Sequence, residues 1–279
     1  MWLKGTKLQC VAILLVSLVL TAGSAFAQFQ DAKDSAEPYV GQQGKDVIWL
    51  PSEQGLVDRM LDLAKVTPQD YVIDLGSGDG RTVITSARRG ARAMGIEYDP
   101  KLFALARKNA ETAGVADRAQ FVNGDIFQSD FSQATVLTMF LLPSLNMKLR
   151  PTILEMKPGT RIVSNSFDME DWQADQTANV GRDEGCAGGY CVARLWIVPA
   201  KVEGNWRLPE GELRITQTFQ MLSGELFLGN RTTPLADGRM NGSQIQFKVG
   251  DILYTGQVEG NTLKGTYSGG KQGEWQASR

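Results

Sequence analysis

Residues Tyr71–Pro100 read YVIDLGSGDGRTVITSARRGARAMGIEYDP, and they decide the fold expected for most of the chain. The apolar run that ends at Leu75 predicts a buried strand, because it is short and glycines follow it. The pattern that comes next predicts a helix ended by Gly90, a residue suited to a helix C-terminus. A second strand, residues 93–96, stops at Glu97. We therefore predict a strand–loop–helix–strand unit of the nucleotide-binding type.

The loop of this unit is GSGDG, residues 76–80, where three glycines allow a tight turn and a close approach to a ligand. Dinucleotide folds prefer G-x-G-x-x-G, and here the spacing is one residue tighter. Asp74 would repel a pyrophosphate but would attract an ammonium group. Glu97 could accept two hydrogen bonds from a ribose diol. The pattern fits S-adenosylmethionine better than NAD, and a turn without a ligand would explain the glycines but not the two acids.

This stretch resembles motif I and the acidic strand end that follows it in class I S-adenosylmethionine-dependent methyltransferases. The resemblance implies S-adenosyl-L-methionine as the cofactor; no metal site is expected, because the chain has no histidine and two cysteines alone do not complete one. The resemblance also implies that the acid after the third strand, Asp125, accepts from the adenine amino group; the alternative for Asp125 is a helix N-cap. The cofactor-binding residues that it implies are Pro51, Asp74, Gly76, Ser77, Gly78, Asp79, Gly80, Glu97, Tyr98, Asp125 and Ile126.

Three further runs indicate a narrower branch of this superfamily: VIWLPSEQGLVDRMLDLAKVTPQDYVIDLGSGDGR, DFSQATVLTMFLLPSLNMKLRP and MKPGTRIVSNSFDMEDW. They are similar to the small bacterial relatives of the ATP-synthase c-subunit lysine methyltransferases, which are related to the histone-type seven-strand lysine methyltransferases. The similarity covers residues 45–198. It implies N-methylation of a protein lysine, and it implies that Leu50-Pro51-Ser52 helps to shape the cofactor pocket.

The residues around the fourth strand leave the methyl acceptor open. Thr138-Met139-Phe140-Leu141 stands where enzymes that methylate nucleobases or glutamine amides carry an N-P-P-Y-type tetrapeptide. The histone enzymes carry an asparagine near this strand end, and here Thr138 or Met139 occupies the place. Acceptors that remain are a protein lysine or a small molecule. An exported, non-catalytic binding protein on the same scaffold is the alternative to an enzyme, and no catalytic residue is assigned.

Composition excludes several other kinds of active site. The chain contains no histidine, which rules out a Ser-His-Asp triad, a Cys-His pair and the usual histidine zinc sites. Its formal net charge is −2, and loss of Lys4 and Lys7 with a cleaved signal would make it −2 − 2 = −4. We expect no nucleic-acid partner from this acidic balance.

Residues 1–27 have the features of a cleavable export signal. Lys4 and Lys7 precede an apolar run, residues 11–20, that is short for a membrane span, and residues 25–27 form an A-x-A cleavage site. We expect export to the periplasm and no stable membrane span after cleavage. An uncleaved anchor is the alternative, and the protein would be cytosolic if the segment is not a signal.

Cys186 and Cys191 are the two cysteines left after such cleavage. In an oxidising compartment a pair at this spacing favours a disulfide. Free thiols or redox activity are the alternatives.

The chain divides into residues 28–44, a flexible lead-in, residues 45–199, a doubly wound parallel α/β domain, and residues 200–279, a small antiparallel β domain. In the α/β domain we expect a helix over 53–64 with Ser52 as N-cap, and strands over 134–140 and 192–199 among others. Regular glycine turns predict that the β domain is a barrel or sandwich with Trp206 and Trp275 in its core. It would serve as a structural cap or a substrate-recognition module.

Overall fold

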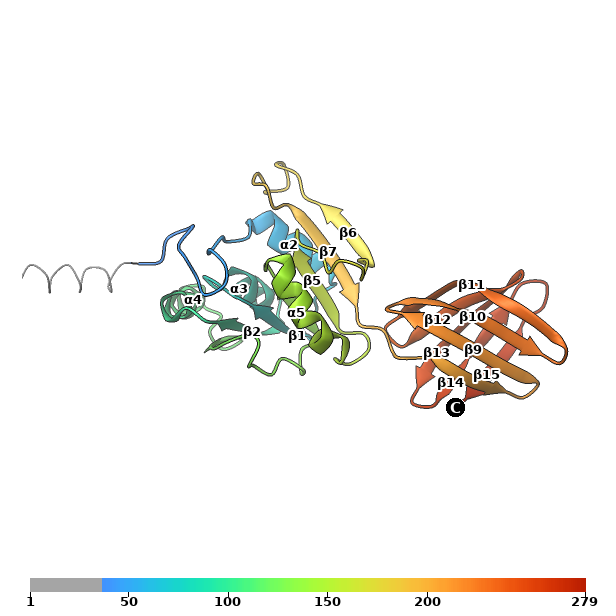
Figure 1. Ribbon diagram of the computed structural model, residues 1–279. Coiled ribbons are helices and arrows are strands. Elements are labelled where there is room, and N and C mark those ends of the chain that lie inside the picture. The colour runs from blue at the N-terminus through green and yellow to red at the C-terminus, as the bar shows by residue number, and fades with distance from the viewer. Residues whose placement is uncertain (1–36) are drawn as a thin grey trace, which may run out of the picture. The chain divides into compact units, whose positions relative to one another are not determined.

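The structure, a computed structural model, describes residues 37–279, so the predicted export signal lies outside the described residues. The described chain contains an α/β part built on a seven-stranded sheet and a closed β-barrel (Figure 1). The last strand of the sheet in chain order ends at Ile197, and the first strand of the barrel begins at Gly204. None of the helices described is both long and apolar enough to cross a membrane.

Five strands of the sheet are parallel, as the alternation of strands and helices predicts. These strands are β1 (Tyr71–Leu75), β2 (Arg92–Glu97), β3 (Ala119–Asn123), β4 (Val136–Met139) and β5 (Arg161–Asn165). The helices are α2 (Gln54–Leu63), α3 (Arg81–Arg88), α4 (Pro100–Thr112) and α5 (Pro143–Leu154). With β6 and β7, defined below, the sheet order is β3-β2-β1-β4-β5-β7-β6. The glycine loop after β1 therefore stands where the strand order reverses, the usual ligand position in such sheets.

Two strands depart from the predicted, wholly parallel sheet. β7 (Val192–Ile197) pairs antiparallel with β5, and β6 (Gln176–Asn179) pairs antiparallel with β7. A parallel partner would need a long crossover, usually a helix, and residues 166–191 contain none. Three of the four β6 residues are exposed, so β6 lacks the apolar alternation that would reveal a strand in the sequence.

Two boundaries also differ from prediction in ways that affect the site. Helix α2 begins at Gln54 with Glu53 at the N-cap, so the prediction of Ser52 as N-cap was wrong. The Ser52 hydroxyl instead accepts a hydrogen bond from Asn165 Nδ2 at 2.9 Å, a tertiary contact across the end of β5. Strand β4 stops at Met139, which leaves Phe140 beyond the sheet.

Side chains of the parallel strands alternate between two apolar cores, because successive strand residues point to opposite faces of a sheet. Val72 packs in the core that α2 and α3 cover, and its neighbour Ile73 packs in the core that α5 covers. The second core contains Trp172 and Trp196, both fully buried. Coverage on both faces buries the inner strands β1, β4 and β5 almost completely, whereas the edge strand β3 is largely exposed.

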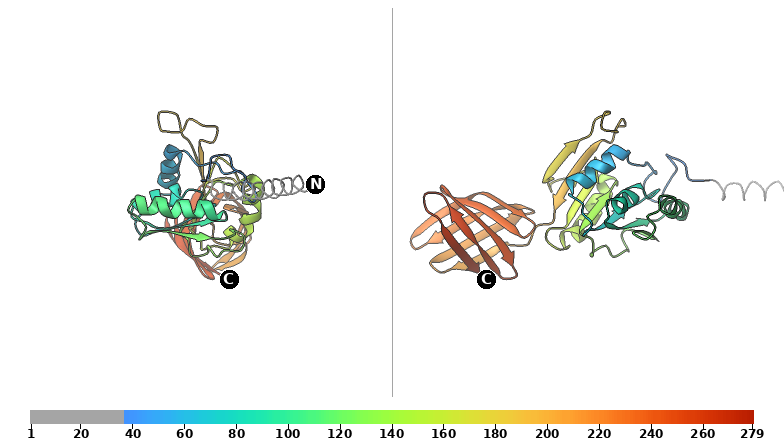
Figure 2. Two further views of the ribbon diagram at one scale, coloured as in Figure 1. Left: turned by 90° about the vertical axis from the view of Figure 1, so that its left-hand side faces the viewer. Right: turned by 180° about the vertical axis from the view of Figure 1, so that it is seen from behind.

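Eight antiparallel strands in the second part close into a barrel, whose wall is also visible from behind in Figure 2. They are β8 (Gly204–Leu208), β9 (Gly211–Thr218), β10 (Met221–Leu228), β11 (Arg231–Asn241), β12 (Gln244–Val249), β13 (Ile252–Glu259), β14 (Thr262–Ser268) and β15 (Gly273–Ser278). The predicted antiparallel β domain is confirmed. The pairing of β8 with β15 at Arg207 and Ser278 makes it a barrel rather than a sandwich. Trp206 and Trp275 are both buried in its interior.

Candidate active site

A cavity of about 260 Å³ lies at the carboxyl ends of the parallel strands, where the glycine loop and three acids meet. Asp74 belongs to β1, Glu97 ends β2, and Asp125 follows β3 by two residues. Parallel strands bring their carboxyl ends to one edge of a sheet, so residues far apart in the chain become neighbours there. The residues predicted to bind the cofactor that line this cavity are Pro51, Asp74, Gly76, Ser77, Gly78, Asp79, Glu97, Tyr98, Asp125 and Ile126.

The glycine loop is held against the end of β2 by backbone hydrogen bonds. The N–H groups of Gly76 and Ser77 both donate to the carbonyl of Ile96, at 2.9 and 3.1 Å. Gly76 has φ 79° and Gly78 has φ 54°, backbone conformations that other residues rarely adopt. Gly80 differs from its neighbours in that it does not line the cavity. A Cβ on Gly80 would lie 2.7 Å from the Phe121 ring, so this glycine serves the packing of the loop.

Asp74 is a buried carboxyl group that faces the cavity and has a hydroxyl partner. Thr138 Oγ1 in β4 donates to Asp74 Oδ1 at 2.7 Å. The pKa of Asp74 is raised from 3.8 to about 7, chiefly by burial and also by the charge of Glu97, while the Thr138 hydrogen bond opposes the rise. A cation in the cavity would favour the ionised form. The position therefore suits a ligand with an ammonium group, and Thr138 is a supporting residue that sequence analysis did not assign to the site.

Glu97 is tied to both the glycine loop and the turn after β2. Glu97 Oε2 accepts from the Gly78 N–H at 2.7 Å, and Oε1 accepts from the Asp99 N–H at 3.0 Å. Burial raises the pKa of Glu97, although these two backbone donors oppose the rise. Because both oxygens are fixed and each keeps a free lone pair, the carboxylate is preorganised to accept from two neighbouring hydroxyl groups.

Asp125 stands at the outer side of the cavity and has a lysine partner. Lys45 Nζ lies 2.7 Å from Asp125 Oδ2 and 4.7 Å from the centre of the Tyr98 ring. The Lys45 hydrogen bond and the Phe127 N–H, which donates to Oδ1 at 2.9 Å, hold the pKa of Asp125 below its ordinary value. The Phe127 contact is a local turn cap. Asp125 thus caps the turn after β3 and also lines the cavity.

The segment Gly44–Ser52 crosses the cavity beside the glycine loop, as predicted for Leu50-Pro51-Ser52. A Cβ placed on Gly78 would lie 2.6 Å from Nε1 of Trp49, so the indole rests against the loop. Arg81 binds the segment to the start of α3, because its Nη1 donates to the Ser52 carbonyl at 2.7 Å while its guanidinium also pairs with Asp79. The contribution of Lys45 had no signal in the sequence, whereas Trp49 belongs to the VIWLPS run that the sequence analysis singled out.

Three aromatic rings form a part of the cavity that the sequence did not predict. Phe140 follows β4, Phe167 follows β5, and Tyr190 lies in the loop before β7; all three line the cavity. Ring centres are 6.0 Å apart for Phe140 and Phe167, 5.3 Å for Phe140 and Tyr190, and 5.6 Å for Phe167 and Tyr190. We call these residues the aromatic trio. They lie over β4 and β5, whereas the acids lie over β1 to β3.

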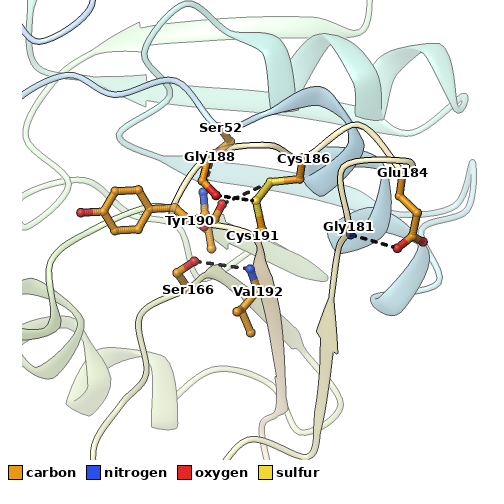
Figure 3. Close-up of a disulfide and its surroundings, with 10 residues drawn as sticks. Ser52, Ser166, Gly181, Glu184, Cys186, Gly188, Tyr190, Cys191 and Val192 are labelled. Atoms are coloured by element: carbon orange, nitrogen blue, oxygen red, sulfur yellow. Dashed lines mark hydrogen bonds between the residues drawn. A yellow bond between two sulfur atoms is a disulfide. The ribbon is translucent and has the colours of Figure 1, made fainter.

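Tyr190 belongs to a loop closed by a disulfide between Cys186 and Cys191, with Cα atoms 5.8 Å apart. Figure 3 shows the Tyr190 ring projecting from this loop, away from the disulfide. Cys186 is only 2% exposed and packs in the core beside α2.

In the stretch of chain that the structure describes, acids and cysteines form no group able to hold a metal ion.

Comparison with known proteins places the chain among methyltransferases. Residues 74–176 match the profile of the ANTKMT methyltransferase domain. A protein-lysine N-methyltransferase of Saccharolobus islandicus is 42% identical over 137 residues, which are 48% of this chain and 85% of the relative. The ATP synthase c-subunit lysine N-methyltransferase of Mus musculus is 34% identical over 113 residues, 40% of this chain and 46% of the relative. The chain thus spans about half the length of this mouse protein.

A solved structure gives a similar result. The crystal structure of an RNA methyltransferase from Salinibacter ruber in complex with S-adenosyl-L-homocysteine is 49% identical to this chain, with a TM-score of 0.50. The match covers 55% of this chain and 96% of that protein. The glycine loop, the acids at the ends of successive strands and these relatives agree, and the chain belongs to the class I S-adenosylmethionine-dependent methyltransferases.

Proposed function

We propose that this protein transfers the methyl group of S-adenosylmethionine to the side-chain amine of a protein lysine. The observation that carries the proposal is its 42% identity to a protein-lysine N-methyltransferase along 85% of that relative. Relatives from Mus musculus that are named for the ATP synthase c-subunit and for the adenine nucleotide translocase support the same acceptor. The methyltransferase assignment itself does not depend on the choice of acceptor.

The residues of the cavity fit the cofactor. Asp74 would balance its ammonium group, Glu97 would hold the ribose hydroxyls, and Asp125 would accept from the adenine amino group. The Ser77 hydroxyl is buried with no hydrogen-bond partner in the described chain, which leaves one further polar group to satisfy. When bound, the cofactor supplies a methyl group already activated by its sulfonium. The protein therefore needs no strong acid or base, in agreement with a chain that contains no histidine.

The protein's own part in the reaction is to align the acceptor and exclude water. Alignment of two reactants can contribute about 7–11 kcal/mol to lowering a barrier. A lysine must arrive as the neutral amine, and an apolar passage lowers the pKa of the ammonium form by desolvation. The aromatic trio and Leu141, Leu142 and Leu145 supply apolar surface to the cavity beyond the ends of β4 and β5.

An RNA acceptor is the second candidate, because the Salinibacter ruber structure is described as an RNA methyltransferase. Charge argues against it. A protein that binds RNA gains most of its affinity from Lys and Arg contacts to phosphates, and this chain has 29 Lys and Arg against 31 Asp and Glu. The carboxylates that line the cavity, Glu97 and Asp125 among them, would further repel a phosphate backbone.

The test is methyl transfer from S-adenosylmethionine with a radioactive methyl group to fractionated cell extract. Parallel samples receive ribonuclease or protease before separation, and labelled protein is hydrolysed to amino acids. The expected product is labelled methyl-lysine that survives ribonuclease. Label found only in nucleotides would replace lysine by RNA as the acceptor, and no label in any fraction would favour a non-catalytic binding protein. Glu97→Ala protein is the matched control, in which weaker cofactor binding should lower the transfer of label at limiting S-adenosylmethionine.

We propose in addition that the protein works outside the cytosol. Support comes from Lys4 and Lys7 before the apolar run, from the A-x-A site at residues 25–27, and from a disulfide of the kind that persists in oxidising compartments. Mass spectrometry of protein from the producing cell should find a chain that starts at Gln28 and is two hydrogens lighter than its reduced form. A soluble cytosolic pool that retains residues 1–27 would contradict export.

A further inference from the structure

The aromatic trio needs an explanation beyond cofactor binding. The polar parts of the cofactor are accounted for by Asp74, Glu97 and Asp125 over β1 to β3. Phe140, Phe167 and Tyr190 occupy the other side of the same cavity, at the ends of β4 and β5. Three rings with centres within 6.0 Å of one another form one continuous aromatic surface.

The trio also connects the cavity with solvent. Tyr190 is 42% exposed, and so is Leu142, which lines the same cavity beyond β4. Large apolar side chains at a cavity mouth are costly to expose, and a contiguous group of them marks a binding surface.

We propose that the aromatic trio is the acceptor passage, which takes an alkyl-amine side chain, and that the Cys186–Cys191 disulfide holds Tyr190 in place to complete it. This inference rests on the proposed lysine acceptor. Aromatic faces attract N-methylated ammonium groups, the product end of the side chain, by cation–π interaction, and they accept the methylene chain behind the charge. The rings also keep water from the reacting amine.

The disulfide connects this passage to the redox state of the protein. Cys186 is anchored in the core beside α2, and the Val180 N–H donates to the Cys191 carbonyl at 2.8 Å, so both ends of the loop are fixed. Between them stand Ala187, Gly188, Gly189 and Tyr190, and two glycines in a four-residue span give the backbone wide freedom once the bridge is lost. Reduction should therefore weaken acceptor binding while the acids and the glycine loop keep their geometry.

The experiment measures binding of a side-chain probe to the full protein saturated with S-adenosylhomocysteine. The probe is Nα-acetyl-Nε-trimethyllysine amide, the uncharged reference is Nα-acetyl-norleucine amide, and NMR titration follows both. Wild-type protein should prefer the trimethyllysine probe. Tyr190→Ala should weaken its binding by about fivefold, whereas Tyr190→Phe, the matched variant that keeps the ring, should stay near wild type.

The redox arm uses the Cys186→Ser/Cys191→Ser double variant. It should bind the probe as weakly as wild-type protein treated with a reductant, and reductant should not change it further. Affinity for S-adenosylhomocysteine and the cooperative thermal transition should be retained in all variants, which separates a lost passage from a lost fold. Equal binding of the two probes by wild type, or unchanged binding by Tyr190→Ala, would overturn the proposal.

Failure of the proposed function has a different signature. If labelled methyl groups enter RNA while the trimethyllysine probe still binds through Tyr190, the proposed binding by the aromatic trio is supported and the proposed lysine acceptor is rejected. If lysine is methylated and Tyr190→Ala leaves both probe binding and acceptor KM unchanged, the acceptor stands and the passage does not.

Discussion

The two sides of the cavity are built in contrasting ways. The acidic side, over β1 to β3, uses short side chains whose carboxylates are fixed by backbone N–H groups and a hydroxyl, as in the pairs Glu97–Gly78 and Asp74–Thr138. The aromatic side, over β4 and β5, uses rings that pack against one another. One of these rings, Tyr190, belongs to a loop that a disulfide closes. The first side suits a small polar molecule, and the second suits an apolar chain with a charged end. Substitutions on the two sides should therefore affect different substrates.

The largest effect is expected from Glu97→Ala. Loss of a fixed carboxylate that accepts from two hydroxyl groups should weaken binding of S-adenosylhomocysteine by about 1.5–3 kcal/mol, the range for hydrogen bonds to a charged group. Isothermal titration calorimetry checks this, with Glu111→Ala on the exposed face of α4 as the control. Unchanged affinity, or equal affinity of wild type for NAD, would contradict the division of the cavity.

A smaller effect is expected from pH. Burial raises the pKa of Asp74 to about 7, and only its ionised form attracts the ammonium group of the cofactor. Affinity should fall by roughly tenfold between about pH 7 and about pH 5.5, a window that lies below the pKa of about 7.7–8.0 of an ordinary α-amino group. Asp74→Asn should bind weakly at both pH values. A wild-type affinity that does not change with pH would show that Asp74 does not face the ammonium group.

The same group has the opposite effect on stability. Because the pKa of Asp74 is about 7 in the folded protein and 3.8 without its surroundings, the folded state holds a proton that the unfolded state releases in this interval. The contribution of Asp74 to the free energy of unfolding should therefore decrease as pH rises from about 4 to about 7. Asp74→Asn should remove this decrease in urea titrations, so it should gain stability relative to wild type at neutral pH while it loses cofactor.

On the aromatic side, Phe167→Ala should raise the KM for the acceptor by about fivefold through loss of one ring of the passage. Affinity for S-adenosylhomocysteine should stay within error of wild type. Phe227→Ala, in the barrel wall, is the matched control and should change neither quantity. A parallel loss of cofactor affinity in Phe167→Ala would mean that the two sides of the cavity are not separate.

The smallest effect is expected from Lys45→Met, which keeps the length of the chain but removes its pairing with Asp125. The pair is partly exposed, so its loss should leave thermal stability nearly unchanged. An Asp125 carboxylate released from Lys45 should raise affinity for S-adenosylhomocysteine by about twofold, a change typical of weak exposed pairs. Lys108→Met is the control, and weaker binding by Lys45→Met would instead make Lys45 a cofactor contact.

The contrast between the two sides also explains how far sequence analysis could go. The acidic side follows from local rules: a buried strand, a glycine loop, a helix and an acid at the next strand end, all within residues 71–100. Each of those elements has a recognisable pattern in consecutive residues of the sequence. Phe140, Phe167 and Tyr190 come from three separate loops, and each sits in a stretch with no repeating pattern, so only the folded sheet brings them together.

The missed edge of the sheet has a related cause. β6 is the edge strand of the sheet, and its residues are polar because most of them are exposed to solvent. β7 runs antiparallel to β5 because the segment after β5 turns back without a helix. Neither property is visible in the hydrophobicity of residues 166–199. The barrel was easier to predict, since its glycine turns and alternating strands recur along residues 204–278.

The pairing of β8 with β15 has a consequence for the order of folding. The strand that starts the barrel finds its last neighbour only after every intervening strand has been made, so closure depends on a contact of long sequence separation. Folds dominated by such contacts form slowly, because loop entropy is lost before the contact compensates for it. During synthesis the α/β part is complete before β15 emerges, and it should reach its native state first. A ribosome-bound chain that ends before β15 should therefore acquire cofactor binding while its barrel strands remain accessible to protease.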